Sequence, residues 1–250
     1  MNEYNADMTD DSRPNDLETD DLTPDDLVNV SYFLKENTAK FPYKRAVVYP
    51  EGRDKNRRVA YTNLTYRQLD RESDRIAAGL EHAGIKRGTR TILMVRQSLD
   101  FFALTFALFK AGAIPVVVDP GMGIKRMLNC MSEGKPEAFI GIPLAHVLRT
   151  VYPKFFSTVK TFVTVGTKYF WGGLTLKEIR GSAPLVHKTA ETRRDETAAI
   201  LFTSGSTGPA KGVVYTHGMF DAQIRQIRSY FNIGENEIDL PTFPLFALFD

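Results

Sequence analysis

Thr203-Ser-Gly-Ser-Thr-Gly-Pro-Ala-Lys-Gly212 directly follows the apolar run Ala198-Ala-Ile-Leu-Phe202. The apolar run is typical of a short buried strand. The glycines let the backbone bend tightly and bring its N–H groups close to an anion, and the hydroxyl side chains add donors. Lys211 adds a mobile positive charge suited to phosphate. The stretch therefore predicts a strand followed by a phosphate-binding loop, against the plainer interpretation of a surface loop.

The Walker A loop, G-x-x-x-x-G-K-[ST], is the competing interpretation of the same residues. Counted from Gly205, the lysine of that pattern falls at Lys211. However, Ala210 replaces its second glycine, and Gly212 replaces the hydroxyl residue that binds magnesium. Two of the four fixed positions fail, so the sequence disfavours a P-loop NTPase.

Strand and helix patterns alternate along most of the chain. This alternation predicts an α/β fold in which helices flank a mostly parallel sheet. Ligands of such sheets bind beyond the carboxyl ends of the strands, where the glycine-rich loop is expected. We expect strands at 45–49, 59–61, 91–95, 114–118, 138–142, 161–165 and 198–202, and helices at 30–40, 65–83, 98–111, 124–132, 144–151, 176–180 and 217–231.

Charge is distributed unevenly along the 250 residues. The first 27 hold ten acidic residues and one basic residue, so the remainder carries +11 against a total of +2. The acidic stretch is poor in apolar residues, which is typical of a disordered segment. We expect an acidic arm over 1–29 and a folded domain over 30–250. The basic residues of the domain are scattered, which disfavours nucleic-acid binding.

Composition also bears on location. Cys130 is the only cysteine, which excludes an internal disulfide framework and favours a reducing compartment. No apolar run approaches the roughly 20 residues of a membrane span, and the first residues lack the pattern of a secretory leader. We therefore expect a cytoplasmic protein. The apolar, aromatic-rich stretch 243–250 leads us to expect that the chain stops within a domain.

The glycine-rich loop resembles the signature of the adenylate-forming enzymes, which include acyl-CoA synthetases, luciferases and the adenylation domains of peptide synthetases. Their loop runs T-S-G-[ST]-T-G-x-P-K-G-V, and residues 203–213 depart from it only at Ala210. Leu64-Thr-Tyr-Arg-Gln-Leu69 is similar to their L-T-Y-x-x-L start of a helix. Residues 109–120 are similar to their K-A-G-A-x-x-V-P-L-D-P segment, and residues 84–91 partly fit G-[VI]-x-x-G-D-x-V. The resemblance implies the amino-terminal part of the family's large α/β domain.

The resemblance also implies ligands and chemistry. ATP and Mg²⁺ would be the cofactors, and a substrate carboxylate would attack the α-phosphate to give an acyl-adenylate and pyrophosphate. No residue is assigned as catalytic, and the spacing of the histidines and Cys130 predicts no protein metal site. The residues that would contact the phosphates or shape the loop are Thr203, Ser204, Gly205, Ser206, Thr207, Gly208 and Lys211.

Two other segments narrow the expected substrate. Acyl-CoA synthetases commonly carry histidine in a P-L-F-H run, where this sequence has Ala247. The run Phe243-Pro-Leu-Phe-Ala-Leu-Phe249 and the turn Asp119-Pro-Gly-Met-Gly123 resemble the β-lactone synthetases of bacterial olefin biosynthesis. The resemblance implies ATP and a long-chain fatty or β-hydroxy acid as ligands, and leaves room for a complex with other lipid-pathway enzymes.

Two alternatives stay open at this point. One is a long-chain acyl-CoA synthetase or fatty acyl-AMP ligase. The other is a non-catalytic nucleotide-binding fragment, because the family's ribose-binding acidic motif and carboxyl-terminal lysine are missing from residues 1–250. For the same reason we expect these residues alone to be inactive. His217 is expected to pack or cap a helix, and the phenylalanines of 101–109 to belong to the core.

Overall fold

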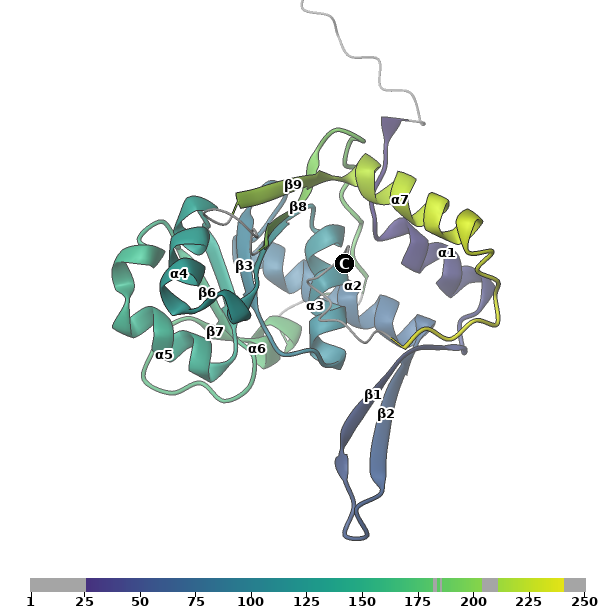
Figure 1. Cartoon of the computed structure of the whole chain (residues 1–250), viewed down its shortest axis with the longest axis horizontal. Helices are drawn as coiled ribbons and strands as arrows, with labels where there is room; N and C mark the ends of the chain where they lie inside the picture. The colour runs from purple at the N-terminus through teal and green to yellow at the C-terminus, as the bar shows by residue number, and fades with distance from the viewer. Residues whose placement is uncertain (1–25, 182–183, 185, 204–210, 241–250) are drawn as a thin grey trace, which may run out of the picture.

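The computed structural model describes residues 26–181, 184, 186–203 and 211–240 (Figure 1). Helices and strands alternate through most of this range. They are α1 (Tyr32–Lys40), β1 (Arg45–Arg53), β2 (Val59–Thr65), α2 (Tyr66–His82), β3 (Arg90–Met94), α3 (Leu99–Lys110), β4 (Ile114–Val118), η2 (Pro120–Met122), α4 (Ile124–Glu133), β5 (Ala138–Gly141), α5 (Pro143–Val151), η3 (Pro153–Phe156), β6 (Thr161–Thr164), β7 (Leu174–Thr175), α6 (Leu176–Gly181), β8 (Thr197–Thr203), β9 (Lys211–Thr216) and α7 (His217–Tyr230).

A seven-stranded sheet forms the centre of the fold. Its strand order is β7-β6-β5-β3-β4-β8-β9. Neighbours from β7 to β8 pair in parallel, whereas β9 pairs with β8 antiparallel. The predicted α/β fold with a mostly parallel sheet is therefore confirmed.

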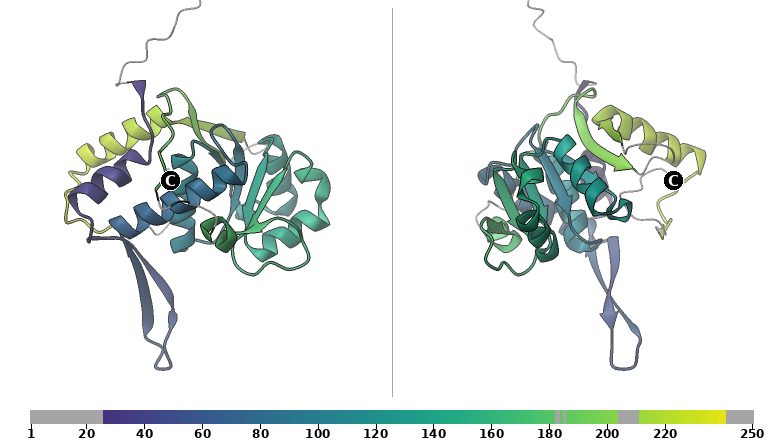
Figure 2. Two further views of the ribbon diagram at one scale, coloured as in Figure 1. Left: turned by 180° about the vertical axis from the view of Figure 1, so that it is seen from behind. Right: turned by 60° about the vertical axis from the view of Figure 1, so that its left-hand side comes forward.

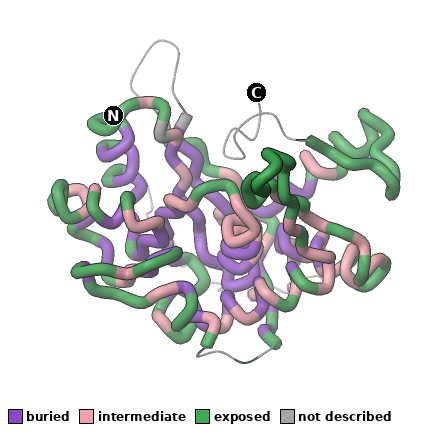
Figure 3. The backbone as a smooth tube through the Cα atoms, turned by 90° about the horizontal axis from the view of Figure 1, so that it is seen from below, coloured by how far each residue is buried: buried purple, intermediate pink, exposed green. Residues whose placement is uncertain are grey.

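Two apolar cores lie on opposite faces of this sheet, because successive strand residues point to opposite sides. On β3, Leu93 joins the core made with α2, α3 and α6, and Ile92 joins the core made with α4 and α5. On β5, Ile140 likewise belongs to the first core and Phe139 to the second. Figure 2 shows the helices on both faces, and Figure 3 shows the buried residues gathered along the central elements. Phe109 is buried, and the partly buried Phe101, Phe102 and Phe106 pack on the first core, as expected.

Local sequence signals correctly predict where α2 begins and ends. The hydroxyl of Thr65 accepts a hydrogen bond from the Gln68 N–H, and the Gln68 side chain accepts one from the Thr65 N–H. This reciprocal pair is the predicted capping box. Behind it, Leu69, Ile76 and Leu80 are buried on the sheet side. The helix ends before Gly84, whose φ of 91° is in the region that favours glycine.

The folded part begins earlier than residue 30. The Val28 N–H donates to the Thr192 carbonyl oxygen at 2.9 Å. The buried Asn29 amide donates to the carbonyl oxygens of Phe109 and Ala190 at 2.9 and 3.1 Å. Val28 and Asn29 thus belong to the fold and not to the expected arm over 1–29. Residues 1–25 of that arm lie outside the described residues.

Three strand assignments differ from the sequence-based expectation, the first being the short strand β7, which was not expected. The loop was expected to run through Gly212, but β9 begins at Lys211 because Val213-Val-Tyr-Thr216 is a β-prone run that pairs with β8. The first hairpin is longer than expected, with seven pairs between Arg45↔Thr65 and Arg53↔Val59. It forms a separate two-stranded sheet that projects from the rest of the molecule (Figure 1).

Candidate nucleotide-binding site

The two ends of the glycine-rich loop meet at the sheet edge. Thr203 ends β8 and pairs directly with Lys211 at the start of β9. Ser204–Ala210, which include the other predicted phosphate-contacting positions, lie outside the described residues. The fold therefore closes a seven-residue loop between two adjacent backbone positions. Its first residue follows the carboxyl end of a strand that runs parallel to its neighbour β4, where α/β sheets bind ligands.

A second turn lies beside Thr203, where this loop begins. Val118 at the end of β4 pairs with Phe202 on β8, so Asp119 and Thr203 follow paired positions on neighbouring parallel strands. The Asp119 carboxylate accepts the Gly121 N–H at 2.7 Å and fixes the turn. Gly123 has a φ of 86°, which favours glycine, and α4 starts at the next residue. In the sequence this turn was only a mark of likeness; its place beside Thr203 follows from the strand order.

Gly212 is held against an aromatic ring. It pairs with Phe202 across β8 and β9, and the Phe202 side chain is 3% exposed. A Cβ added at Gly212 would lie 2.8 Å from the Phe202 Cζ, closer than real Cβ atoms approach. The backbone that leads out of the loop thus sits on the Phe202 ring. The sequence alone did not predict this need for glycine, because it placed Gly212 within the loop and gave no sign of the contact with Phe202.

His217 lies just past β9 and is 1% exposed. Its Nδ1 accepts the Val30 N–H at 3.3 Å, and its ring packs edge-on against Phe109. Burial lowers the pKa of His217 to about 4, although the nearby Glu196 carboxylate opposes this shift. The imidazole is therefore neutral near pH 7, and the expectation of a packing residue is confirmed. The helix cap is supplied by the Thr216 hydroxyl, which accepts the Met219 N–H.

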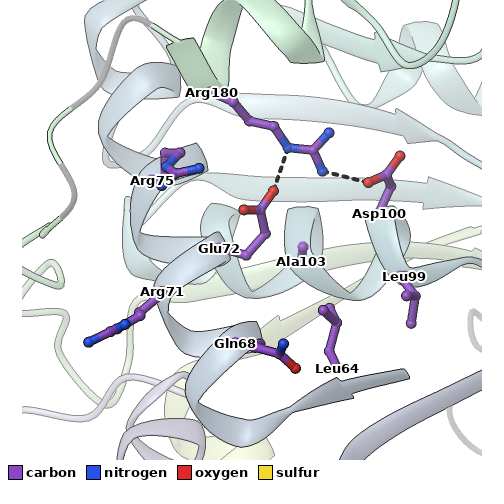
Figure 4. A pocket seen from close by; sticks show the side chains of 9 residues that line it. All are labelled: Leu64, Gln68, Arg71, Glu72, Arg75, Leu99, Asp100, Ala103 and Arg180. Atoms are coloured by element: carbon purple, nitrogen blue, oxygen red, sulfur yellow. Dashed lines mark hydrogen bonds and ion pairs between the residues drawn. The ribbon is translucent and has the colours of Figure 1, made fainter. Parts of the chain in front are cut away.

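A surface pocket of about 380 Å³ lies elsewhere, between α2, α3 and α6 (Figure 4). Arg180 crosses it and pairs with Glu72 and with Asp100, the latter at 2.6 Å. The remaining lining residues include Leu64, Leu99 and the arginines of α2. None of them comes from β8, β9 or the turn after β4, so this pocket is separate from the candidate nucleotide site.

Two further properties concern the described ranges of the chain. No three His, Cys, Asp or Glu side chains there come together in an arrangement that would hold a metal ion. No described helix is both long and apolar enough to cross a bilayer.

Residues 34–249 match the family of AMP-binding enzymes. The chain belongs to this AMP-binding family. It is 48% identical over 226 residues to an olefin β-lactone synthetase of Xanthomonas campestris, covering 90% of this chain and 40% of that protein. It is also 48% identical to an olefin β-lactone synthetase of Stenotrophomonas maltophilia, covering 89% of this chain and 41% of that protein. The chain thus spans about two fifths of the length of these two relatives.

The fold also agrees with that of a solved structure. A putative long-chain-fatty-acid CoA ligase from Rhodopseudomonas palustris superposes with a TM-score of 0.73 at 17% identity. The match covers 88% of this chain and 52% of that one. At this identity the likeness supports the shared architecture of the sheet and its helices.

Proposed function

We propose that the protein uses ATP to adenylate a fatty carboxylate, and that its substrate is a long-chain β-hydroxy acid which it converts to a β-lactone. Membership of the AMP-binding family supports the adenylation step. The 48% identity to two olefin β-lactone synthetases supports the second. Because the chain covers about 40% of those proteins, the activity is proposed for the protein in the full length that its gene encodes.

The first step needs positive charge and hydrogen-bond donors around the phosphates. A carboxylate oxygen attacks the α-phosphorus, the bond to the β-phosphate oxygen breaks, and pyrophosphate leaves. We assign phosphate contacts to Thr203, the hydroxyl residues of 204–208 and Lys211, with Gly205 and Gly208 shaping the loop. The pairing of Thr203 with Lys211 supports this assignment, because it joins both loop ends at one point of the sheet edge. Mg²⁺ bound with ATP would neutralise the charge on the phosphates.

The second step is a ring closure. The β-hydroxyl oxygen attacks the carbonyl carbon of the acyl-adenylate, the bond to the AMP oxygen breaks, and the hydroxyl proton is released. A nucleophile within the substrate is already held near the carbonyl, so no second substrate has to be positioned. Ala247, which lies outside the described residues, stands where acyl-CoA synthetases commonly carry histidine, and this supports the lactone over the thioester.

A long-chain acyl-CoA synthetase is the second candidate. The observation in its favour is that a long-chain-fatty-acid–CoA ligase of Mycobacterium tuberculosis is 26% identical over 89% of this chain. The family likeness alone does not separate thioester formation from ring closure.

We further propose a cytoplasmic location, since the single thiol, Cys130, is free and buried. We also propose that an acidic arm precedes a partial adenylation domain, as predicted for 1–29 and 30–250, with Val28 and Asn29 counted with the domain. A complex with other lipid-pathway enzymes is proposed on the likeness to the olefin enzymes alone.

ATP–pyrophosphate exchange tests the adenylation step. The full-length protein is incubated with labelled pyrophosphate, ATP, Mg²⁺ and either a long-chain β-hydroxy acid or the fatty acid of equal length. We expect exchange that depends on the acid and is fastest with the β-hydroxy acid. Absence of exchange with every acid tested would contradict the proposal.

A further inference from the structure

The β1–β2 hairpin is an arm that stands away from the rest of the fold. All three ribbon views show it projecting from the base of α2 (Figures 1 and 2). Its two strands pair only with each other within the described sheets, and residues 50–61 are all exposed. An isolated two-stranded ribbon is marginally stable in water. Contact with a binding partner would therefore stabilise the arm.

Its tip is fixed by one carboxylate. The Asp54 Oδ1 accepts the N–H groups of Asn56 and Arg58 at 2.8 and 2.9 Å, and the Asp54 N–H donates to the Arg58 carbonyl oxygen at 2.9 Å. Arg57 adopts a φ of 63° within this turn. Asp54 thus holds the turn through backbone N–H groups, and none of the ion pairs within the described residues joins it to the basic side chains around it.

The tip carries four cations in six residues. They are Arg53, Lys55, Arg57 and Arg58, and residues 44–65 together hold a net charge of +4. Within the described chain, none of the four forms an ion pair. Arg53 donates to the Arg57 carbonyl oxygen at 2.8 Å, which leaves its charge unpaired. Four unpaired cations at the end of a projecting arm attract an extended anionic surface.

One face of the arm gathers the apolar side chains of Val48, Pro50, Val59 and Tyr61, beside Asn63 and the tip residue Arg53. Pro50 pairs with Tyr61, and Arg53 pairs with Val59, so side chains of β1 and β2 share this face. Val48 precedes Pro50 by two residues and extends the same face. Val48 is 48% exposed and Tyr61 is 67% exposed. An apolar strip with a tyrosine therefore leads directly to the basic tip.

We propose that this hairpin docks the protein on an anionic lipid bilayer. A soluble polyanion would satisfy the cations and leave the apolar strip in water. A bilayer interface offers anionic headgroups to the tip and an apolar layer to the strip, and the combination of two weak signals gives stable binding. The tyrosine ring suits the headgroup level, since it is apolar with one polar end. This inference does not depend on the proposed reaction.

Vesicle sedimentation with the full-length protein tests the proposal. Vesicles are made either of phosphatidylcholine alone or of phosphatidylcholine mixed with phosphatidylglycerol, which gives the surface the negative potential that attracts basic residues. We expect binding to the anionic vesicles, loss of most of that binding at about 0.5 M salt, and little binding to the neutral ones. Equal binding to both vesicle types would overturn the proposal.

Matched variants separate the arm from the rest of the surface. Each basic side chain near an anionic bilayer strengthens binding about fivefold, so Lys55→Glu with Arg58→Glu should lower the partition coefficient at least about 25-fold. Lys154→Glu with Lys160→Glu makes the same charge change at exposed positions on another part of the fold, and should have a much smaller effect. An equal loss in both pairs would contradict docking by the arm.

The apolar strip has its own test. Val48→Ser with Tyr61→Ser should weaken binding about tenfold, whereas Val186→Ser with Tyr230→Ser, also exposed, should not. Unchanged melting temperatures exclude misfolding. Binding of the wild-type protein to soluble poly-glutamate and to a short RNA is measured as well. If the protein binds either of them and not the anionic vesicles, the arm binds a soluble polyanion and the proposal is wrong.

Discussion

The Lys110 ammonium group lies 2.7 Å from the Asp74 Oδ1 in the interior between α2 and α3. It also donates to Asp70, at 2.6 Å to the carboxylate and 2.8 Å to the carbonyl oxygen. The Lys110 side chain is fully buried, and the side chains of Asp70 and Asp74 are 17% and 12% exposed. A buried charge is tolerated only when it is paired and hydrogen-bonded, so this cluster fixes how α2 and α3 pack.

Lys110→Met should therefore lower the free energy of unfolding by about 3 kcal/mol, because it leaves two partly buried carboxylates without a partner. Urea denaturation at pH 7 measures the change. Lys177→Met, at an exposed position on α6, is the control and should change stability by less than about 0.5 kcal/mol. A loss below about 1 kcal/mol for Lys110→Met would contradict this account of the cluster.

The buried His146 makes stability depend on pH. Arg149 Nε donates to its Nδ1 at 3.0 Å, so Nε2 carries the proton and donates to the Val163 carbonyl oxygen at 3.1 Å. Burial is the main cause that lowers the pKa of His146 to about 4 from its usual 6.5. The unfolded chain then binds the proton more tightly than the folded one. The contribution of neutral His146 to the free energy of unfolding is therefore fully present above pH 6.5 and is lost as the pH drops towards 4.

His146→Gln should remove up to roughly 3 kcal/mol of this pH dependence between pH 7 and pH 4. The measurement is the free energy of unfolding of wild type and variant at several pH values, since the titrating carboxylates and His217, whose pKa burial also lowers to about 4, contribute equally to both. His82→Gln, at an exposed position, is the control. If wild type and His146→Gln lose stability in parallel on acidification, His146 is not the responsible group.

Gly212→Ala should disturb the candidate site through Phe202. The new methyl group would meet the ring at 2.8 Å, and overpacking of this kind costs about 1–3 kcal/mol. We expect weaker binding of a non-hydrolysable ATP analogue by calorimetry, with recovery in the double variant Gly212→Ala/Phe202→Leu. Gly52→Ala, where the added atom meets nothing within 4 Å, should bind like the wild type. No effect of Gly212→Ala would show that the ring does not position the loop.

Lys211→Ala should slow adenylation in the full-length protein. Loss of one charge-assisted phosphate contact corresponds to about 1.5–3 kcal/mol, or roughly 10- to 150-fold in rate. Thr207→Val should act in the same direction. The ATP–pyrophosphate exchange rate measures both, and wild-type rates in both variants would refute the phosphate assignment of the loop.

Local signals explain how much of the fold could be predicted. The capping box at Thr65 and the run Ile114–Val118 have their own sequence marks, and both elements form as expected. The partners of Lys110 could not be predicted, because Asp70 and Asp74 lie about 40 residues away and meet it only through helix packing. The same holds for the site. The loop is visible in sequence, but its place beside Asp119 follows from the pairing of β4 with β8.

Product analysis tests the central claim most directly. The full-length protein is incubated with ATP, Mg²⁺ and a long-chain β-hydroxy acid, with and without coenzyme A, and the products are identified by mass spectrometry. The account predicts a β-lactone with AMP and pyrophosphate in equal amounts, independent of coenzyme A. A coenzyme A-dependent thioester as the main product, with simple fatty acids used equally well, would contradict it.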